Sequence, residues 1–439
     1  AEAHLRRIEE VNPRLNAVVT LAPDVIERAR EAEAALMRGD VAGPLHGVPL
    51  TVKDTIDTEG LRTTSGSLLR ADFIPAADAP AVARLRRAGA IPLGKTNTSE
   101  LALDYTTDNP VFGRTNNPHA PAHTPGGSSG GCAAAVAAYM TPASLGSDLS
   151  GSVRVPAHFC GVSALRPTAA RVPTAGHLPP TGGPFALGAS FGPIARHVED
   201  LALLYGVLAD VRPFGVVEKG TASPPDGLDP DLRGRRLAYY TDDGVVPVTA
   251  ETREAVERVA GALQEAGLVV SEDRPPGVEH GARLWFDLFS RPMQSFLRSM
   301  YAGRESEGGP LVRALLAREG GGAAESRDVQ NDSGAALAER DRLRAALVEW
   351  MKSTPLLVAP VGAVPAFAHG ARRVSVGGTE LGVFRAFSYA QTFNVFDLPA
   401  ACVPVGRSRD GLPIGVQIVG RPFAEDSVLA AARAVEEAL

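Results

Sequence analysis

Residues 125–131 read Pro-Gly-Gly-Ser-Ser-Gly-Gly, and residues 146–157 read Gly-Ser-Asp-Leu-Ser-Gly-Ser-Val-Arg-Val-Pro-Ala. Between them, residues 132–139 consist almost entirely of alanine, valine and cysteine, a composition that predicts a helix packed closely against a sheet. The first glycine-serine loop thus runs straight into a core helix, which a flexible linker does not normally do. We expect it to be an ordered loop at the N-terminus of that helix.

Short apolar runs alternate with helical patterns on both sides of this stretch, which is typical of an α/β protein. Residues 48–52 predict a strand, residues 79–88 predict a helix that Gly89 ends, and residues 91–94 predict a second strand, parallel to the first. A second such unit is expected over residues 236–271, with Thr249 capping its helix. The sheet is therefore expected to have a parallel component.

The remaining segments carry weaker patterns. We expect a surface loop over residues 213–231, an insertion or a lid over the glycine-rich residues 305–334, a helix over residues 335–352, and strands over residues 356–359, 394–405 and 411–420.

Composition excludes several classes of protein. The 439 residues are 44% hydrophobic and 21% charged, so the chain can bury a large core, and the net charge of −6 argues against a nucleic-acid partner. No apolar run is long enough to span a membrane, and the start reads as an amphipathic helix over residues 1–13. We expect a cytoplasmic protein; because the chain opens in mid-helix, a removed N-terminal segment or export signal stays open.

Cysteine and histidine usage predicts neither a disulfide framework nor a metal site. Cys132, Cys160 and Cys402 form no paired spacing, and the nine histidines are scattered. His119 and His123 are four residues apart, but a proline lies between them and disfavours a common helical face. We expect no metal and no cofactor.

The two loops offer the parts of an acyl-transfer site. A glycine loop before a helix can bind phosphate, but the motifs of nucleotide-binding loops are missing. Gly151 before Ser152 instead allows a hydroxyl nucleophile and a row of backbone N–H donors to face one carbonyl. Such a nucleophile needs a base, and Lys53 would serve if burial kept its amine neutral. The residues alone are equally consistent with a surface lysine.

The chain resembles the amidase signature family. The resemblance rests on residues 125–168, which contain both loops and Cys-Gly-Val-Ser-Ala-Leu-Arg-Pro-Thr (160–168). It extends to shorter phrases at residues 47–54, 94–100, 192–200, 398–404 and 411–420 and weakens only over about 205–340. The family's fold implies one α/β domain over residues 1–439, with a mixed, largely central sheet covered by helices on both faces. It also implies a catalytic core at about 43–205 and 384–420 and a more variable middle at about 206–340.

The resemblance implies a Ser, cis-Ser, Lys triad. Ser152 would be the nucleophile that accepts the acyl group, Ser128 would relay its proton after a cis peptide bond, and Lys53 would be the base. The spacings of 75 residues from Lys53 to Ser128 and 24 from Ser128 to Ser152 suit this assignment.

The resemblance also assigns supporting residues. The backbone N–H groups of Leu149, Ser150, Gly151 and Ser152 would form the oxyanion hole. Ser129, Asp148 and Arg154 would support the site, and Gly126 and Gly127 would bind substrate. Many family members have glycine where this chain has Ser150, which disfavours a left-handed backbone there.

Three functions remain at this point. The favoured one is hydrolysis of a carboxylic amide through an acyl-enzyme on Ser152. The first alternative is the glutamine-hydrolysing A subunit of a tRNA-dependent amidotransferase, although that subunit typically has Gln where this chain has Val155 and Thr-Gly-Gly where it has residues 149–151. The second is a ligand-binding scaffold without activity.

The substrate and the partners are less well defined by the sequence. We expect the pocket walls at residues 99–106, 174–191, 285–301 and 384–393, whose aromatic residues suit an apolar acyl or aryl group. A small-molecule amide is the expected partner, no nucleic acid or membrane is expected, and a homodimer stays open.

Overall fold

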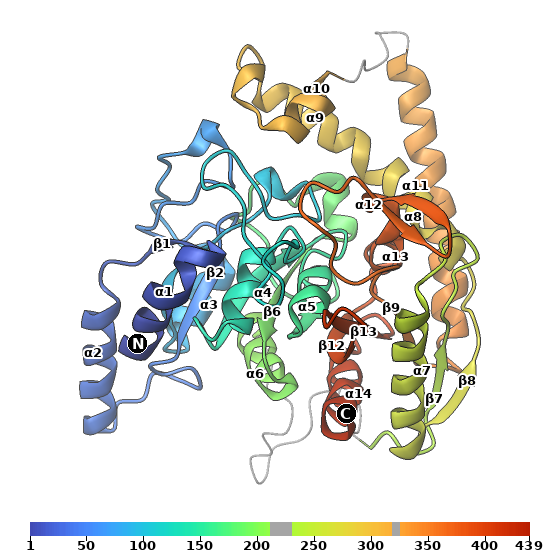
Figure 1. Ribbon diagram of the computed structural model, residues 1–439, viewed down its shortest axis with the longest axis horizontal. Coiled ribbons are helices and arrows are strands. Elements are labelled where there is room, and N and C mark those ends of the chain that lie inside the picture. The colour runs from blue at the N-terminus through green and yellow to red at the C-terminus, as the bar shows by residue number, and fades with distance from the viewer. Residues whose placement is uncertain (211–230, 318–324) are drawn as a thin grey trace.

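A computed structural model describes residues 1–210, 231–317 and 325–439. Within these ranges the chain forms one α/β domain built on an 11-stranded sheet in the order β1-β3-β2-β4-β6-β5-β12-β13-β9-β7-β8 (Figure 1). The strands are β1 (Val18–Leu21), β2 (Pro49–Lys53), β3 (Ile91–Thr96), β4 (Ala143–Asp148), β5 (Ser163–Arg166), β6 (Ser190–Ala195), β7 (Arg236–Tyr239), β8 (Val269–Glu272), β9 (Leu356–Pro360), β12 (Ala400–Arg407) and β13 (Pro413–Gly420). A separate hairpin pairs β10 (Arg373–Val376) with β11 (Thr379–Gly382).

The large sheet is mixed. Its parallel pairs are β2 with β3, β2 with β4, β7 with β8 and β7 with β9, and its other pairs are antiparallel. Because β2 and β4 are parallel neighbours, their carboxyl ends meet at the same edge of the sheet. Lys53 ends β2, and the loop that carries Ser152 follows β4, so both of these candidate residues lie at this edge.

Helices cover both faces of the sheet, as expected for the fold class. One hydrophobic core contains buried residues of α1 (Glu2–Leu15), α4 (Gly130–Ala137), α5 (Arg154–Cys160), α8 (Gly281–Trp285), α11 (Glu325–Trp350), α12 (Val383–Ala386) and α13 (Ser388–Val395). A second core contains residues of α3 (Pro80–Arg87), α6 (Val198–Ala209), α7 (Ala250–Glu265) and α14 (Glu425–Ala438). α2 (Val25–Arg38) packs against β3 at the blue edge of Figure 1.

Two helices stand at one end of the molecule, beyond the sheet. α9 (Arg291–Met300) and α10 (Pro310–Leu316) lie at the top of Figure 1, and α9 follows α8 through one π-helical turn (Phe286–Ser290). A small core of Leu101, Leu297, Tyr301 and Val312 joins these helices to the segment that follows β3. Met293 of α9 also lines the same cavity as Ser147 and Asp148 at the end of β4.

The close packing of α4 has a simple cause in its sequence. Its first residues are glycines, and a Cβ on Gly131 would lie 2.4 Å from the carbonyl O of Asn97. Gly130 to Val136 are all buried. Glycine and alanine therefore let this helix approach the sheet more closely than larger side chains would allow.

Most of the predicted elements are confirmed, and three boundaries are corrected. α4 begins at Gly130 instead of residue 132, and α11 begins at Glu325, ten residues before the predicted start. The strand predicted over residues 394–405 starts only at Ala400, because residues 388–395 form α13. Most of the predicted loop 213–231, and residues 318–324 of the predicted insertion or lid, lie outside the described residues.

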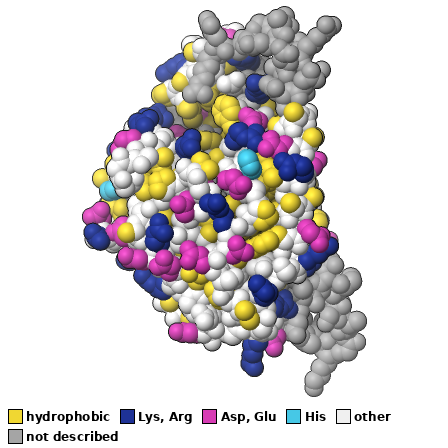
Figure 2. Space-filling view, turned by 90° about the vertical axis from the view of Figure 1, so that its right-hand side faces the viewer, with side chains coloured by type: hydrophobic (Ala, Val, Ile, Leu, Met, Phe, Trp, Pro, Cys, Tyr) yellow, Lys and Arg dark blue, Asp and Glu magenta, His cyan; other side chains and the backbone are white. Residues whose placement is uncertain are grey.

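The surface carries charges of both signs. On the face in Figure 2, Lys and Arg alternate with Asp and Glu, and apolar side chains are scattered between them. Among the described residues, no helix is both long and apolar enough to cross a membrane.

Candidate active site

Lys53 is the last residue of β2 and is completely buried. Its Nζ lies 2.6 Å from Oγ of Ser128 and 3.0 Å from Oγ of Ser147. Burial disfavours the ammonium form and lowers the pKa of Lys53 to about 7, although Cys132 and Asp148 oppose the shift. A substantial fraction of this lysine is therefore a neutral amine near neutral pH.

Ser128 precedes α4 in the first glycine-serine loop. The Gly127–Ser128 peptide bond is cis, as the resemblance implies. The two preceding glycines are required by packing, because a Cβ on Gly126 would lie 2.9 Å from Cα of Pro156 and one on Gly127 would lie 2.4 Å from the carbonyl O of Asp104. Neither glycine lines the cavity described below, and substrate binding by the two stays a prediction.

Ser152 follows a sharp turn between β4 and α5. Gly151 has φ +99°, and a Cβ there would lie 2.5 Å from Cβ of Ala390, so a glycine is required by both conformation and space. Ser150 is not left-handed, which removes the difficulty expected from its departure from glycine. The N–H of Ser129 donates to the carbonyl O of Ser152 (3.1 Å) and fixes the two loops to each other.

A buried ion pair supports the loop of residues 149–153, which carries Ser152. Arg154 Nε lies 3.1 Å from Oδ2 of Asp148, and its Nη2 lies 3.0 Å from Oδ1. Arg154 also donates to Gln417 and Asn394, each at 2.7 Å. The Arg154 guanidinium overcomes the effect of burial and holds the pKa of Asp148 well below its usual range. Asp148 is therefore a fixed anion whose charge is already balanced, and it is not available as a general base.

The same carboxylate engages one of the four predicted oxyanion donors. The N–H of Gly151 donates to Oδ1 of Asp148 (2.8 Å). Among the described residues, the N–H groups of Leu149, Ser150 and Ser152 donate to no acceptor. These three amides thus stay available for a substrate oxygen, while the Gly151 amide holds the turn.

Two aromatic side chains fix the carbonyls of this loop. Trp285 Nε1 donates to the carbonyl O of Leu149 (2.8 Å), and the hydroxyl of Tyr105 donates to that of Ser150. A carbonyl held in one direction also orients the N–H on the other side of the same planar peptide unit. The loop is thereby ordered before any substrate binds.

The side chain of Ser129 is hydrogen-bonded to the backbone of Ser147 and not to Ser128 or Lys53. Its Oγ donates to the carbonyl O of Ser147 (3.3 Å) and accepts from the N–H of the same residue (3.4 Å). Any support that Ser129 gives to the relay therefore passes through the end of β4.

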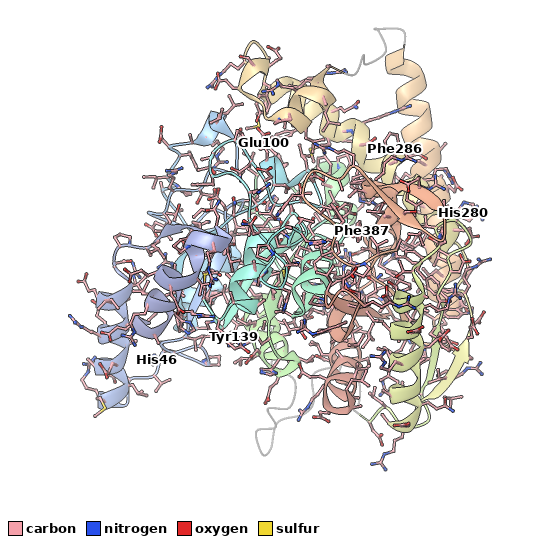
Figure 3. All side chains as sticks on the ribbon, viewed as in Figure 1. His46, Glu100, Tyr139, His280, Phe286 and Phe387 are labelled. Atoms are coloured by element: carbon pink, nitrogen blue, oxygen red, sulfur yellow. The ribbon has the colours of Figure 1, made fainter. Side chains whose placement is uncertain are left out.

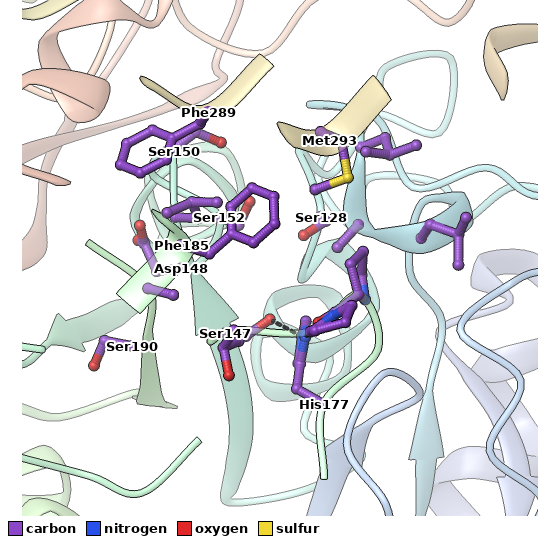
Figure 4. Close-up of a pocket in the computed structure, with 18 of the residues that line it drawn as sticks. Ser128, Ser147, Asp148, Ser150, Ser152, His177, Phe185, Ser190, Phe289 and Met293 are labelled. Atoms are coloured by element: carbon purple, nitrogen blue, oxygen red, sulfur yellow. Dashed lines mark hydrogen bonds between the residues drawn. The ribbon is translucent and has the colours of Figure 1, made fainter. Parts of the chain in front are cut away.

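Sequence reasoning missed His177 and Ser147. His177 Nε2 lies 2.9 Å from Oγ of Ser147 (Figure 4). The same hydroxyl contacts Lys53. The only signal was the position of His177 inside the predicted pocket wall 174–191, since no spacing relates it to the two loops.

Ser128 and Ser152 both line one cavity, which encloses about 660 Å³ of empty space with its mouth included. Its walls come from the four segments predicted for it and from the loop of residues 147–152, and Figure 4 shows Phe185, Phe289 and Met293 around the serines. The apolar lining residues are Leu101, Ala102, Leu103, Leu149, Pro179, Pro180, Phe185, Ala189, Trp285, Phe289, Met293 and Phe384. The ionisable lining residues are Asp148 and His177, and both have partners within the protein. No cluster of three potential metal ligands occurs among the described residues.

Comparisons with known proteins bear on the family of the chain. A family model described as Amidase matches residues 1–429. The A subunits of glutamyl-tRNA(Gln) amidotransferase from Moorella thermoacetica and Thermus thermophilus are 35% and 36% identical to this chain; the matches cover 99% and 100% of it and 92% and 93% of those proteins.

Solved structures of amide hydrolases superpose on the whole chain. A crystal structure described as an amidase gives a TM-score of 0.86 at 31% identity and covers 100% of this chain and 95% of its own. 6-Aminohexanoate cyclic dimer hydrolase in complex with substrate gives 0.83 at 29%, and a bacterial aryl acylamidase of the amidase signature family gives 0.84 at 26%; each covers 100% of this chain and 92% of its own. This chain belongs to the amidase family and is an amide-hydrolysing enzyme.

Proposed function

We propose that this enzyme hydrolyses an uncharged carboxylic amide to a carboxylic acid and an amine or ammonia through an acyl-enzyme on Ser152. The observation that carries the proposal is the buried contact of 2.6 Å between Lys53 Nζ and Ser128 Oγ, beside a cavity that Ser128 and Ser152 both line. A base, a relay and a nucleophile then face one substrate carbonyl.

The first half of the reaction forms the acyl-enzyme. Neutral Lys53 takes the hydroxyl proton of Ser128 as Ser128 takes that of Ser152, and Ser152 Oγ bonds to the carbonyl carbon. The amides of Leu149, Ser150 and Ser152 stabilise the oxyanion. The C–N bond then breaks, and the leaving nitrogen receives the proton that Lys53 returns through Ser128.

The second half releases the acid. Water donates its proton along the same relay and attacks the ester carbon of the acyl-enzyme. When the tetrahedral intermediate collapses, Ser152 regains its proton, and the carboxylic acid leaves. Besides the substrate and water, the proposed mechanism uses only side chains and backbone groups of the chain itself.

The cavity lining supports an uncharged substrate. Asp148 is neutralised by Arg154, and burial together with the nearby Lys53 charge lowers the pKa of His177 to about 3, so this ring is neutral. Among the described residues, no lining side chain is left to pair with an α-ammonium or α-carboxylate group. A free amino acid would therefore lose its hydration without electrostatic compensation.

One observation favours a second candidate, glutamine hydrolysis as the A subunit of an amidotransferase. The curated relatives cited above carry that name at 35% and 36% identity. In that case a partner protein would have to complete the glutamine site.

A panel of amides distinguishes the two candidates. Acyl anilides and aliphatic amides should be hydrolysed by the chain alone, glutamine should not, and Ser152→Ala should abolish turnover while the circular dichroism spectrum stays the same. Glutamine hydrolysis that appears only with a partner protein, and without turnover of neutral amides, would reverse the order of the two candidates.

A further inference from the structure

A hydrogen-bonded chain leads from Lys53 away from Ser128 and ends at His177. Lys53 Nζ lies 3.0 Å from Ser147 Oγ, which lies 2.9 Å from Nε2 of His177 (Figure 4). The other ring nitrogen, Nδ1, lies 2.6 Å from the carbonyl O of Pro179. The base thus has two hydroxyl neighbours, of which the proposed mechanism uses one.

The direction of these hydrogen bonds follows from the acceptor at the far end of the row, the Pro179 carbonyl. The Pro179 carbonyl can only accept, so Nδ1 of His177 carries the proton and Nε2 carries the lone pair. Ser147 must then donate its hydroxyl proton to Nε2, which leaves its oxygen free to accept from Lys53. A neutral amine that donates to Ser147 can turn its lone pair toward Ser128.

The backbone holds His177 in this place. The N–H of Asp57 donates to the carbonyl O of Gly176 (2.8 Å), and the N–H of Leu178 donates to that of Thr55 (3.0 Å). The segment that carries His177 is consequently bonded to the residues that directly follow Lys53. The His177 ring also packs beside Phe191, with 5.6 Å between the ring centroids.

We propose that His177 is a positioning residue of the reaction: through Ser147 it fixes the Lys53 amine so that the lone pair faces Ser128. The proposal rests on the proposed role of Lys53 as the base. It assigns Ser147 a second duty as well, because the same oxygen accepts from the ammonium once Lys53 holds the proton. His177 itself stays neutral throughout and transfers no proton.

The proposal predicts a direction for the pH profile. Without the acceptor at position 177, Ser147 is free to donate into the Lys53 lone pair, which stabilises the neutral amine and lowers the pKa of Lys53 further. The acid limb of the profile should then move to lower pH while the maximal rate falls. The substitution leaves the other ionisable groups near Lys53 and His177 unchanged. These groups are Cys132 and Asp148 near Lys53, and Arg70 and Lys95 near His177.

The test measures how fast a fluorophosphonate labels Ser152 across a range of pH, together with kcat and KM for a neutral amide. His177→Leu should lower the plateau labelling rate and kcat by about tenfold or more, while KM stays within about twofold of the wild-type value. The acid limb of its pH profile should move to lower pH. His177→Gln should restore most of the rate, because its side-chain oxygen reaches the position of Nε2 and accepts from Ser147.

Two further variants separate positioning from structure. Ser147→Ala combined with His177→Leu should be no more than about twofold slower than the slower single variant, because both changes break the same chain. His119→Leu is the matched control: His119 also bonds a backbone carbonyl, that of Cys160 at 2.9 Å, and does not line the cavity. It should leave the labelling rate and the acid limb unchanged.

Either of two results would overturn the proposal. One is a His177→Leu enzyme with the wild-type rate and acid limb. The other is an equal loss of labelling rate and kcat in His177→Leu and His177→Gln that parallels a fall in the thermal midpoint of unfolding. Failure of the proposed function would look different, because Lys53→Met would then be labelled as fast as wild type.

Discussion

Arg154 and Asp148 form a two-point ion pair with no solvent exposure at the loop that carries Ser152, with contacts of 3.0 and 3.1 Å. The carboxylate of this pair accepts the N–H of Gly151 and that of Val153. The pair therefore balances a buried charge and sets the backbone on both sides of Ser152.

Removing the cation should unfold this part of the molecule more easily. Arg154→Leu leaves Asp148 buried and unpaired, so we expect the free energy of unfolding to fall by about 3–5 kcal/mol and activity to be lost. Denaturant titration measures the effect. The matched control is Arg433→Leu, which breaks the exposed pair with Glu437 (2.8 Å) and should leave the midpoint unchanged. Equal midpoints for both variants would contradict the role of the buried pair.

The pH dependence of kcat/KM should report Lys53. Its pKa is lowered to about 7, and a base must be deprotonated to act, so activity should fall about tenfold per unit as pH drops well below 7 and level off above it. Asp148 and His177 titrate far below this range. Lys95, with a pKa lowered to about 8, bonds Ile56 and Thr58 and does not line the cavity. A Lys95→Met enzyme should keep the acid limb of kcat/KM near pH 7. If the limb disappeared in this variant, the titrating group would be Lys95 and not Lys53.

Trp285 should matter for the rate more than for binding. Trp285→Phe keeps an aromatic ring in the cavity wall but loses the hydrogen bond of 2.8 Å to Leu149, which orients the Ser150 amide. We expect kcat to fall about tenfold, because an oxyanion donor becomes less well aligned, with a smaller change in KM. Phe289→Leu changes the same wall without touching a hydrogen bond and should act mainly on KM. Steady-state kinetics on one anilide compares the two, and a pure KM effect in Trp285→Phe would be the contrary result.

Glu100 should hold the end helices onto the catalytic body. Figure 3 places it in the upper part of the molecule, on the side of α9 and α10. Its carboxylate accepts from the hydroxyl of Tyr301 (2.8 Å) and the N–H of Gly309 (2.9 Å). Glu100→Ala should therefore speed amide hydrogen exchange in α10 and leave exchange in β4 unchanged.

The matched control for Glu100 is Glu307, which lies just before α10. Glu307→Ala removes an exposed pair with Arg304 (2.6 Å) and should not change the exchange rate of α10. If both variants exchanged alike, Glu100 would not be the residue that fastens these helices.

Local patterns predicted the elements around Lys53 because periodicity and turn residues act over short distances. The strand, helix and strand over residues 48–94 appear as β2, α3 and β3, and Thr249 caps α7 through the N–H of Thr252 (3.3 Å). The strand predicted from residue 394 was wrong in its first residues, because the apolar pattern there does not indicate the turn that precedes β12. Asp397 has φ +50° and Pro399 follows, so the backbone turns before β12 begins.

Long-range hydrogen bonds in the site could not be read from the sequence. Arg154 reaches Asn394 and Gln417, which lie 240 and 263 residues away along the chain. His177 meets Ser147 only because its loop is bonded to the backbone after β2. The resemblance supplied the three proposed catalytic residues, but the partners that orient them depend on the packed fold.

Trapping the acyl-enzyme tests the central claim most directly. The protein is mixed with a neutral aryl amide, quenched in acid within one turnover and analysed by peptide mass spectrometry. The account predicts an acyl adduct on Ser152 that is absent from Ser152→Ala and accumulates far more slowly in Lys53→Met. An adduct on Ser128, or turnover of the amide by Ser152→Ala, would contradict it.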